Sequence, residues 1–368
     1  MSSNRPLSEL DTRAVRLLGP LLQQSGLARP ADALRDGRWR ALGGGRSAAT
    51  VIHLTPWSGA GRADGSALAV KFGSRPEIAR ERTHYLAHAQ HGLPRKARPE
   101  LLGHAVDGDA AALCYSWVGA PVARSWTTVL RRGDLSSVSS VLRNLIAPMG
   151  AGWYAPAERQ SERDLVLHYR RRHFAGAGSL QAAESVLAEW AARYFRLRWD
   201  NGVYVRGALA FEAPSRLLER RLPAREWHSC IVHGDANSDN IISTGRPGGW
   251  ALIDFLKTGR GHVFEDLIAL EHSVRINAPA HGARWPSILE DERRIAMGRH
   301  AGDGAGIGWA ILQIRAAARR RFGAVEPMSN YHLGVLAVGL RLTRATDLSH
   351  AAKARITAAT LCAAQALS

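Results

Sequence analysis

The sequence of 368 residues is 46% hydrophobic and carries a formal net charge of +17. A chain of this length and composition buries one large core or two smaller ones, so two lobes are expected. The first residues lack the apolar core of a signal peptide, and no run of about 18 apolar residues occurs, which predicts a cytoplasmic location and no membrane span. The three cysteines are scattered along the chain, which argues against a disulfide framework or a zinc site.

The positive charge favours an anionic partner, such as a nucleotide, a phosphorylated metabolite, a nucleic acid or an acidic protein surface. The alternative is coding bias, because nearly all basic residues are arginine, and the lysines are only Lys71, Lys96, Lys257 and Lys353. Arginine-rich tracts such as HYRRRHF lie in helix-like segments, and no nucleic-acid-binding module accompanies them. We therefore expect no nucleic-acid partner.

The first third of the chain predicts a helical extension, residues 1–37, followed by a small sheet, residues 38–120. Strand-like runs flank the Gly-rich turn of RWRALGGGRSAATVIHL, and further strands are expected in ALAVKFG and before WVG. A helix is expected after Ser74, because Ser74 and Glu77 have the spacing of a capping box and Gly92 follows the pattern. Its expected apolar face consists of Ile78, Tyr85, Leu86 and Ala89.

From residue 121 onward helical periodicity dominates. One helix is predicted by the stripe of Leu187, Trp190, Tyr194 and Leu197, and two or three more lie in the last sixty or so residues, around Trp309, Leu336 and Ile356. The exception is a β-hairpin near residue 247. The pattern predicts an α+β protein with a small β-rich part and a larger helical part that contains this hairpin.

The hairpin is formed by NIIS and WALID, which TGRPGG separates as a turn. A pairing centred on Pro247 sets Asn240 opposite Asp254, and opposed residues of an antiparallel pair lie about 4.5–5.5 Å apart. An amide oxygen and a carboxylate at that distance would share a cation, for which Mg²⁺ is suited. Asp235, five residues before Asn240, would accept the proton of a substrate hydroxyl that attacks phosphorus. The alternative is a hairpin with polar ends and no site.

The order of these groups is that of kinases, in which an Asp base is followed by an Asn and a second Asp on metal. With HGD at 233–235, Asn240, and IDF at 253–255, the chain resembles the aminoglycoside phosphotransferase and choline kinase family of the protein-kinase-like fold, over residues 39–271. The resemblance implies two lobes, 38–120 for the nucleotide and 121–368 for the catalytic loop and metal. The tract LIDFLKTGRGHVFEDLIALE also resembles bacterial ternary-complex-associated kinase-like domains.

The family requires a Lys on a strand of the small lobe and a Glu on the following helix. Lys71 lies in the strand ALAVKFG, where its ammonium would reach the α- and β-phosphates of ATP. Glu77 and Glu81 are both candidates for its partner. Because the capping box accounts for Glu77, we assign the pairing to Glu81, for which a surface pair with an Arg is the alternative.

Three further assignments follow from the resemblance. Gly43, Gly44 and Gly45 would form the turn that covers the phosphates, and the backbone around Trp117 would bond adenine as the hinge between the lobes. Asp266 would brace the catalytic loop through its backbone amides, although an Asp in the first turn of a helix is also favoured by the helix dipole. His233 is interpreted as a structural residue of that loop.

Two functions are consistent with these residues. The first is an ATP- and Mg²⁺-dependent phosphotransferase that moves the γ-phosphoryl group to a hydroxyl of a small molecule, and a polycationic acceptor is disfavoured by the net charge. The second is a kinase-like nucleotide-binding module that signals through a protein partner without turning over a small molecule. Residues 151–225 match no motif, and the sequence does not name the acceptor.

Overall fold

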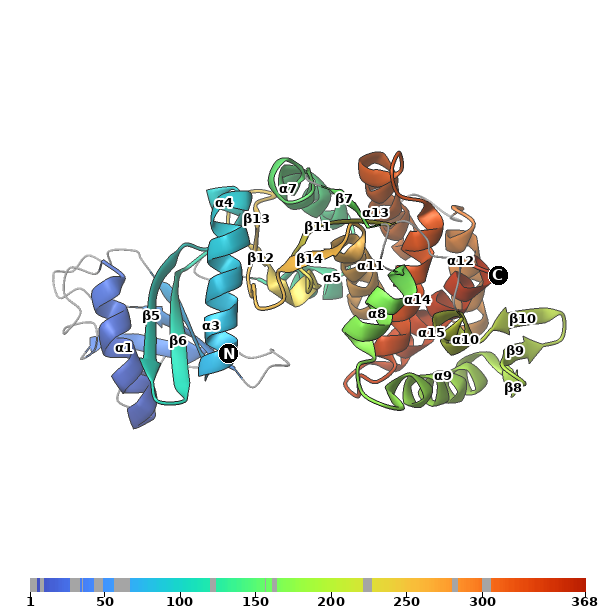
Figure 1. Ribbon diagram of the computed structural model, residues 1–368, viewed down its shortest axis with the longest axis horizontal. Coiled ribbons are helices and arrows are strands. Elements are labelled where there is room, and N and C mark those ends of the chain that lie inside the picture. The colour runs from blue at the N-terminus through green and yellow to red at the C-terminus, as the bar shows by residue number, and fades with distance from the viewer. Residues whose placement is uncertain are drawn as a thin grey trace. The chain divides into compact units, whose positions relative to one another are not determined.

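The computed structural model describes residues 5–6, 10–26, 34, 36–42, 49–55, 67–119, 124–155, 157–160, 164–220, 227–279, 284–299 and 306–368. The chain divides into two units. The first unit consists of Met1–Ser125, Ala151–Trp153 and Asp239–Gly259, and the second of Trp126–Gly150, Tyr154–Ser238 and Arg260–Ser368 (Figure 1). The α+β class predicted from the sequence is confirmed, with strands concentrated in the first unit and helices in the second.

The first unit is built on a six-stranded antiparallel sheet with the order β1-β2-β3-β4-β6-β5. The strands are β1 (Arg5–Pro6), β2 (Arg38–Ala41), β3 (Thr50–Thr55), β4 (Leu68–Ser74), β5 (Leu101–Asp107) and β6 (Ala110–Ser116). Neighbouring side chains on a strand point to opposite faces. On β4, therefore, Val70 and Lys71 belong to different faces of the sheet.

One face of the sheet is covered by α1 (Thr12–Gln24), which begins where the Asp11 side chain accepts a hydrogen bond from the Ala14 amide. Its leucines form a core with residues of the five strands β2 to β6, namely Leu17, Leu18, Leu21, Leu22, Trp39, Ile52, Leu54, Leu68, Val70, Ala105, Ala112 and Cys114. Figure 1 shows α1 (dark blue) against β5. The segment predicted as an extension, residues 1–37, thus contributes a helix to the core of the first unit.

The other face of the sheet is covered by α3 (Arg75–His84), which continues through a π-helical turn, Tyr85–Ala89, into α4 (Gln90–Gly92). Ser74 is the N-cap as predicted, but the capping box is absent, because Ser74 Oγ donates to Glu77 Oε2 at 2.8 Å. The prediction that Leu86 is buried was also wrong. Ile78, Tyr85 and Ala89 are buried, whereas Leu86 is 36% exposed, since it lies a residue beyond Tyr85 and so about 100° further around the helix.

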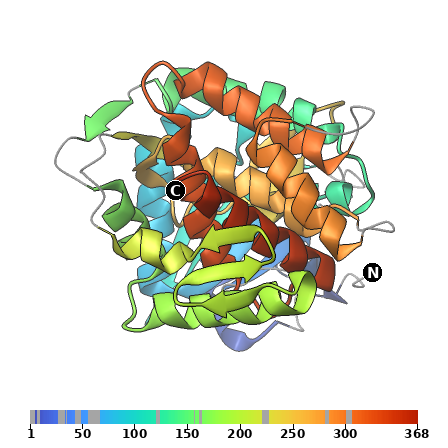
Figure 2. The same ribbon diagram turned by 90° about the vertical axis from the view of Figure 1, so that its right-hand side faces the viewer.

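The second unit is mainly helical. Its helices are α5 (Trp126–Arg131), α6 (Ser137–Val141), α7 (Ala147–Gly152, whose last residues belong to the first unit), α8 (Leu165–His173), α9 (Ser179–Phe195), α10 (Pro214–Glu219), α11 (Glu265–Asn277), α12 (Trp285–Ala296), α13 (Ile307–Phe322), α14 (Met328–Leu342) and α15 (His350–Gln365). The last helix, α15, packs against α9, α11, α12 and α14, and it crosses the middle of Figure 2 in dark red. The predicted stripe is buried, with Leu187, Trp190 and Tyr194 on α9 and Leu197 two residues beyond the end of that helix.

Two small sheets complete the second unit. One has the order β10-β9-β8 and is formed by β8 (Arg198–Asp200), β9 (Val203–Arg206) and β10 (Leu209–Glu212). The other has the order β14-β11-β7 and is formed by β7 (Glu158–Gln160), β11 (Trp227–Val232) and β14 (Gly259–His262). The β11 strand leads directly into the predicted catalytic loop.

Helix α11 is anchored by buried ion pairs. Glu271 accepts hydrogen bonds from Arg275, from Arg315 on α13 and from Tyr331 on α14, and Arg275 also bonds Glu292 on α12. Although burial alone would raise the pKa of Glu271, the two guanidinium groups hold it well below its usual range. Removing one partner of such a buried pair leaves an uncompensated charge, so these bonds fix α11 against three neighbours.

In the part of the chain that the structure describes, the helices are too short or too polar to span a bilayer.

The packing of α1 on the sheet yields a stability prediction. Leu18→Ala removes a fully buried side chain and is expected to lower the free energy of unfolding by about 2–5 kcal/mol. Val15→Ala, on the exposed side of the same helix, is the matched control and should change it little. Denaturant unfolding measures both. Equal, small effects of the two substitutions would show that α1 is not part of the core.

Candidate active site

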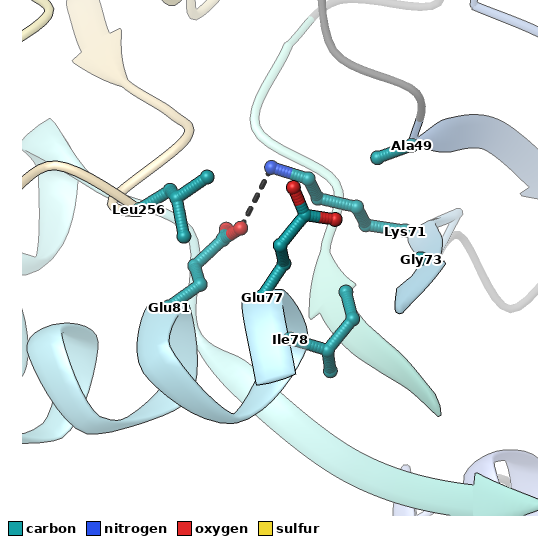
Figure 3. A pocket seen from close by; sticks show the side chains of 7 residues that line it. All are labelled: Ala49, Lys71, Gly73, Glu77, Ile78, Glu81 and Leu256. Atoms are coloured by element: carbon teal, nitrogen blue, oxygen red, sulfur yellow. Dashed lines mark ion pairs between the residues drawn. The ribbon is translucent and has the colours of Figure 1, made fainter. Parts of the chain in front are cut away.

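The centre of the first unit's candidate site is Lys71. Its Nζ lies 2.6 Å from Oε2 of Glu81 on α3 and 2.9 Å from Oδ1 of Asp254, which follows the hairpin. Figure 3 shows the Lys71 side chain reaching from β4 toward Glu81, with Glu77 beside it. The predicted pairing of Lys71 with Glu81 is present, and Glu77 bonds Ser74.

Both residues of the ion pair between Lys71 and Glu81 are buried. Lys71 is 7% exposed and Glu81 is 1% exposed. Burial by itself would lower the pKa of Lys71, but the carboxylates of Glu81 and Asp254 outweigh it and raise that pKa above its ordinary value. Burial raises the pKa of Glu81 against the pull of Lys71, and Tyr115 Oη donates to Glu81 Oε1 at 3.1 Å. The ammonium is therefore held charged and in one position.

A small cavity adjoins Lys71 and Glu81. Its other lining residues come from β4, α3 and two loops: Ala49, Gly73, Glu77, Ile78 and Leu256 (Figure 3).

The hairpin register differs from the prediction by one residue. Strands β12 (Ile241–Ser243) and β13 (Trp250–Leu252) pair Ser243 with Trp250, and the Ile253 amide donates to the Asn240 carbonyl at 3.0 Å. Asn240 thus faces Ile253, and the predicted opposition to Asp254 was wrong. The reason is the turn at 244–249, which has one residue fewer than a pairing centred on Pro247 requires and is closed by Thr244 N–H to Gly249 O at 3.0 Å.

Asp254 leaves the strand in a left-handed conformation, with φ of 65°. That backbone is costly for a residue with a side chain, so its surroundings must hold it. Phe255 is fully buried with its ring 5.3 Å from that of Tyr85, and a ring nitrogen of His84 lies 2.8 Å from the Leu256 carbonyl oxygen. These contacts fix the segment after the hairpin to α3, and they explain why 239–259 belongs to the first unit although the prediction placed it in the lobe 121–368.

Asn240 and Asp254 provide an amide oxygen and a carboxylate, the donor types that Mg²⁺ accepts. The Asp254 side chain is 32% exposed, so one side of it is accessible. Across the described ranges no cluster of three or more His, Cys, Asp or Glu side chains is arranged to hold a metal ion. Mg²⁺ commonly takes one or two protein ligands together with water and phosphate oxygens.

In the second unit the loop after β11 is held by Asp266, at the start of α11. The Asp266 carboxylate accepts the His233 amide at 2.9 Å, the Gly234 amide at 3.0 Å and the Tyr154 hydroxyl at 3.1 Å. Burial raises the pKa of Asp266, while these bonds and His233 oppose the rise. The predicted brace is present, and it acts on the two residues before Asp235.

The Asp235 carboxylate has a neighbour that the sequence did not reveal. Asn237 Nδ2 donates to Asp235 Oδ1 at 3.2 Å, and the Asn237 amide donates to the Asp235 carbonyl at 2.7 Å. The signal was present as an Asp followed two residues later by Asn, a spacing typical of local side-chain turns. Further along the loop, the Ser238 amide donates to Ser273 Oγ on α11 at 3.0 Å. Asp235 thus lies on a loop that is anchored to α11 on both sides.

Two predicted nucleotide contacts have different outcomes. Gly43, Gly44 and Gly45 lie outside the described residues. Trp117 follows β6, and its amide donates to the Ala67 carbonyl at 3.0 Å, which extends the pairing of β4 with β6. The boundary between the units falls shortly after it, at Ser125. Because the Trp117 amide has this acceptor, adenine binding at the predicted hinge would rely on other backbone groups there.

A model of a protein family, described as the phosphotransferase enzyme family, matches residues 156–311. The matched segment contains Asp235, Asn240, Asp254 and Asp266. The predicted phosphotransferase class is confirmed over this segment. No curated protein matches the sequence.

Among solved structures, an aminoglycoside-3'-phosphotransferase of type VIII is 20% identical, with 83% of this chain and 92% of that chain covered and a TM-score of 0.43. A glucosamine kinase is 14% identical, with coverages of 93% and 98% and a TM-score of 0.44. The ethanolamine kinase of Plasmodium vivax is 10% identical, with coverages of 90% and 84% and a TM-score of 0.38.

The bonds of Asp266 predict a specific effect of Asp266→Asn. Asparagine has an NH₂ group in place of one carboxylate oxygen. That group faces a backbone N–H, so this buried donor loses its acceptor. The expected loss in the free energy of unfolding is about 1–3 kcal/mol. Glu290→Gln, which affects only partly exposed ion pairs on α12, serves as the control. Chemical denaturation compares them. An unchanged midpoint for Asp266→Asn would contradict the brace.

Proposed function

We propose that this protein is an ATP- and Mg²⁺-dependent phosphotransferase that moves the γ-phosphoryl group to a hydroxyl group of a small molecule. The observation that carries the proposal is the buried Lys71, whose ammonium lies between Glu81 and Asp254. A purely structural ion pair needs one carboxylate. A lysine between a helix Glu and an accessible Asp is the arrangement that phosphate binding and metal binding both require.

In this proposal the residues of the first unit bind the nucleotide. Glu81 keeps the Lys71 ammonium charged and positioned, and the ammonium binds phosphate oxygens of ATP. Asp254 and Asn240 would hold the cation once the ammonium contacts phosphate in place of Asp254. Bound Mg²⁺ would supply charge neutralisation at the β- and γ-phosphates. In this proposal the site needs both Lys71 and Asp254. This need accounts for the strained backbone of Asp254, which the contacts of Phe255 and Leu256 hold in place.

Asp235 is the proposed base. Asn237 donates to Oδ1, which helps to fix the orientation of the carboxylate that would accept the hydroxyl proton. The hydroxyl oxygen forms a bond to the γ-phosphorus, the bond from that phosphorus to the oxygen of ADP breaks, and the hydroxyl proton passes to Asp235. Anchoring of the loop by Asp266 and Ser273 keeps the carboxylate in a fixed orientation during this step.

The acceptor in this proposal is neutral or anionic. The net charge of +17 favours approach of such molecules over that of a polycation. The net charge affects only the approach of these molecules to the protein, because charges more than about 8 Å apart are largely screened at physiological salt.

The test is transfer of label from γ-labelled ATP to a small-molecule extract of the source organism, with and without Mg²⁺. Wild type should form a Mg²⁺-dependent labelled product. Asp235→Asn should lower the rate by about 10²–10⁴-fold, the range that a general base contributes, with ATP binding preserved. Asp254→Ala should lose transfer and the Mg²⁺ dependence of ATP binding.

Asp239→Asn is the matched control, since this exposed residue of the same motif has no proposed role. Absence of transfer from wild type, with equal ATP binding by all four proteins, would contradict the enzymatic proposal and favour a nucleotide-binding signalling module. Equal transfer by wild type and Asp235→Asn would contradict the role of the base alone.

A further inference from the structure

Helix α8 lies in the segment that matched no sequence motif, and its last turn contacts the catalytic loop. The Arg172 guanidinium forms an ion pair through Nε with Glu265 Oε1, and its Nη2 donates to the Gly234 carbonyl at 3.4 Å. The Arg172 side chain is 24% exposed and that of Glu265 is 6% exposed. Arg172 therefore joins three elements of the second unit: α8, the loop before Asp235, and the start of α11.

The orientation of the Gly234 carbonyl affects the next residue of the loop, Asp235. This carbonyl belongs to the planar peptide unit that continues into the Asp235 amide, so its orientation sets the direction in which the Asp235 backbone begins. The Gly234 amide, on the other side of the residue, is held by Asp266. Gly234 has a φ of 75°, in the left-handed region that favours glycine. Because glycine has no side chain to pack, its conformation depends on bonds to its backbone such as these two.

Glu265 is a fixed partner for Arg172. It is the first residue of α11 and directly precedes Asp266, so the ion-pair partner of Arg172 and the residue that holds the Gly234 amide are adjacent in the chain. Gly261 on β14 leaves the space for its carboxylate, because a Cβ there would overlap Glu265 Oε2. His168, one turn before Arg172 on α8, lies 3.9 Å from the same oxygen through Nε2. The Glu265 carboxylate thus has little freedom to move away.

We propose that Arg172 is a positioning residue for the base: it holds the Gly234 carbonyl opposite the Asp266 brace and thereby orients Asp235. The proposal rests on the proposed function, in which Asp235 accepts a proton. It gives α8 a role in the rate of transfer through Asp235, and none in nucleotide binding, which residues of the first unit perform.

Two substitutions separate this role from a structural ion pair. Arg172→Lys keeps the positive charge for Glu265, but a single ammonium lacks the forked donors that serve a carboxylate and a carbonyl together. Arg172→Met removes both bonds. Arg171→Met, at the exposed neighbouring position of α8, is the matched control for the loss of charge.

The kinetic measurement is ATP turnover with Mg²⁺. The phosphoryl acceptor is the molecule that becomes labelled in the transfer experiment, or water if no molecule becomes labelled. Arg172→Lys and Arg172→Met should both lower kcat by about 10–100-fold, because a small misplacement of a reacting group costs up to about that much. The KM for ATP should stay within about twofold, and Arg171→Met should match wild type. A kcat for Arg172→Lys equal to that of wild type would overturn the proposal and leave the proposed function intact.

A double-mutant cycle with Glu265→Gln tests the pathway of the effect. If the ion pair with Glu265 holds Arg172 in place, the loss in kcat of the double variant should be markedly smaller than the two single losses combined. Fully additive losses would contradict the coupling of the two residues.

Amide hydrogen exchange provides a readout that needs no activity. Arg172→Lys should accelerate exchange in the peptide that contains residues 233–237 by about tenfold or more, while the peptides of α14 and α15 stay as in wild type. If wild type shows no turnover of any kind, the proposed function fails and the role of Arg172 in catalysis fails with it; the exchange result then decides only whether Arg172 holds the loop. Unchanged exchange in the loop would overturn the positioning proposal in either case.

Discussion

The ion pair of Lys71 with Glu81 is the constraint on which the first unit depends. A buried ammonium is stable only with a partner, and the alternation of β4 places Lys71 on the face that α3 covers while Val70 enters the core under α1. The second contact, to Asp254, ties the segment after the hairpin to the same helix. One lysine thus accounts for the packing of a strand, a helix and a loop that are distant in the sequence. It also explains why the hairpin belongs with the sheet.

The second unit has a comparable arrangement around one carboxylate. Asp266 holds the amides of His233 and Gly234, and the helix that carries it is fixed by the buried ion pairs of Glu271, Arg275 and Arg315. The loop before Asp235 is therefore attached to a rigid helix. The two arrangements differ in character: the first holds a cation near an accessible carboxylate, and the second holds a backbone in the conformation that its glycine permits.

The sequence predicted those features that follow from residue type and order along the chain. Lys71 was identifiable because lysine is rare here and lies on a strand before a helix, and Glu81 because Glu77 had another partner. Glu77 does bond Ser74, although not as a capping box. The brace by Asp266 followed from family resemblance. These features depend on local patterns, which a sequence displays directly.

Other features depend on geometry that a sequence does not display. The observed hairpin register differs from the predicted one by a residue, because the register depends on the number of residues in the turn at 244–249. Gly245 and Gly248 of this turn both adopt positive φ. Arg172 and Asn237 contact the loop, and neither contact follows from a motif that the sequence displays. Arg172 in particular lies 63 residues before Asp235, and only the packing of α8 brings it to the Gly234 carbonyl.

The measurement that tests the central claim most directly is a crystal structure of the protein with Mg²⁺ and a non-hydrolysable ATP analogue. We expect the Lys71 ammonium to keep its contact with Glu81 and to exchange Asp254 for a phosphate oxygen, with Mg²⁺ bound by Asp254 and Asn240. A nucleotide bound away from Lys71, or one bound while Lys71 still contacts Asp254 and the metal has neither ligand, would contradict the account.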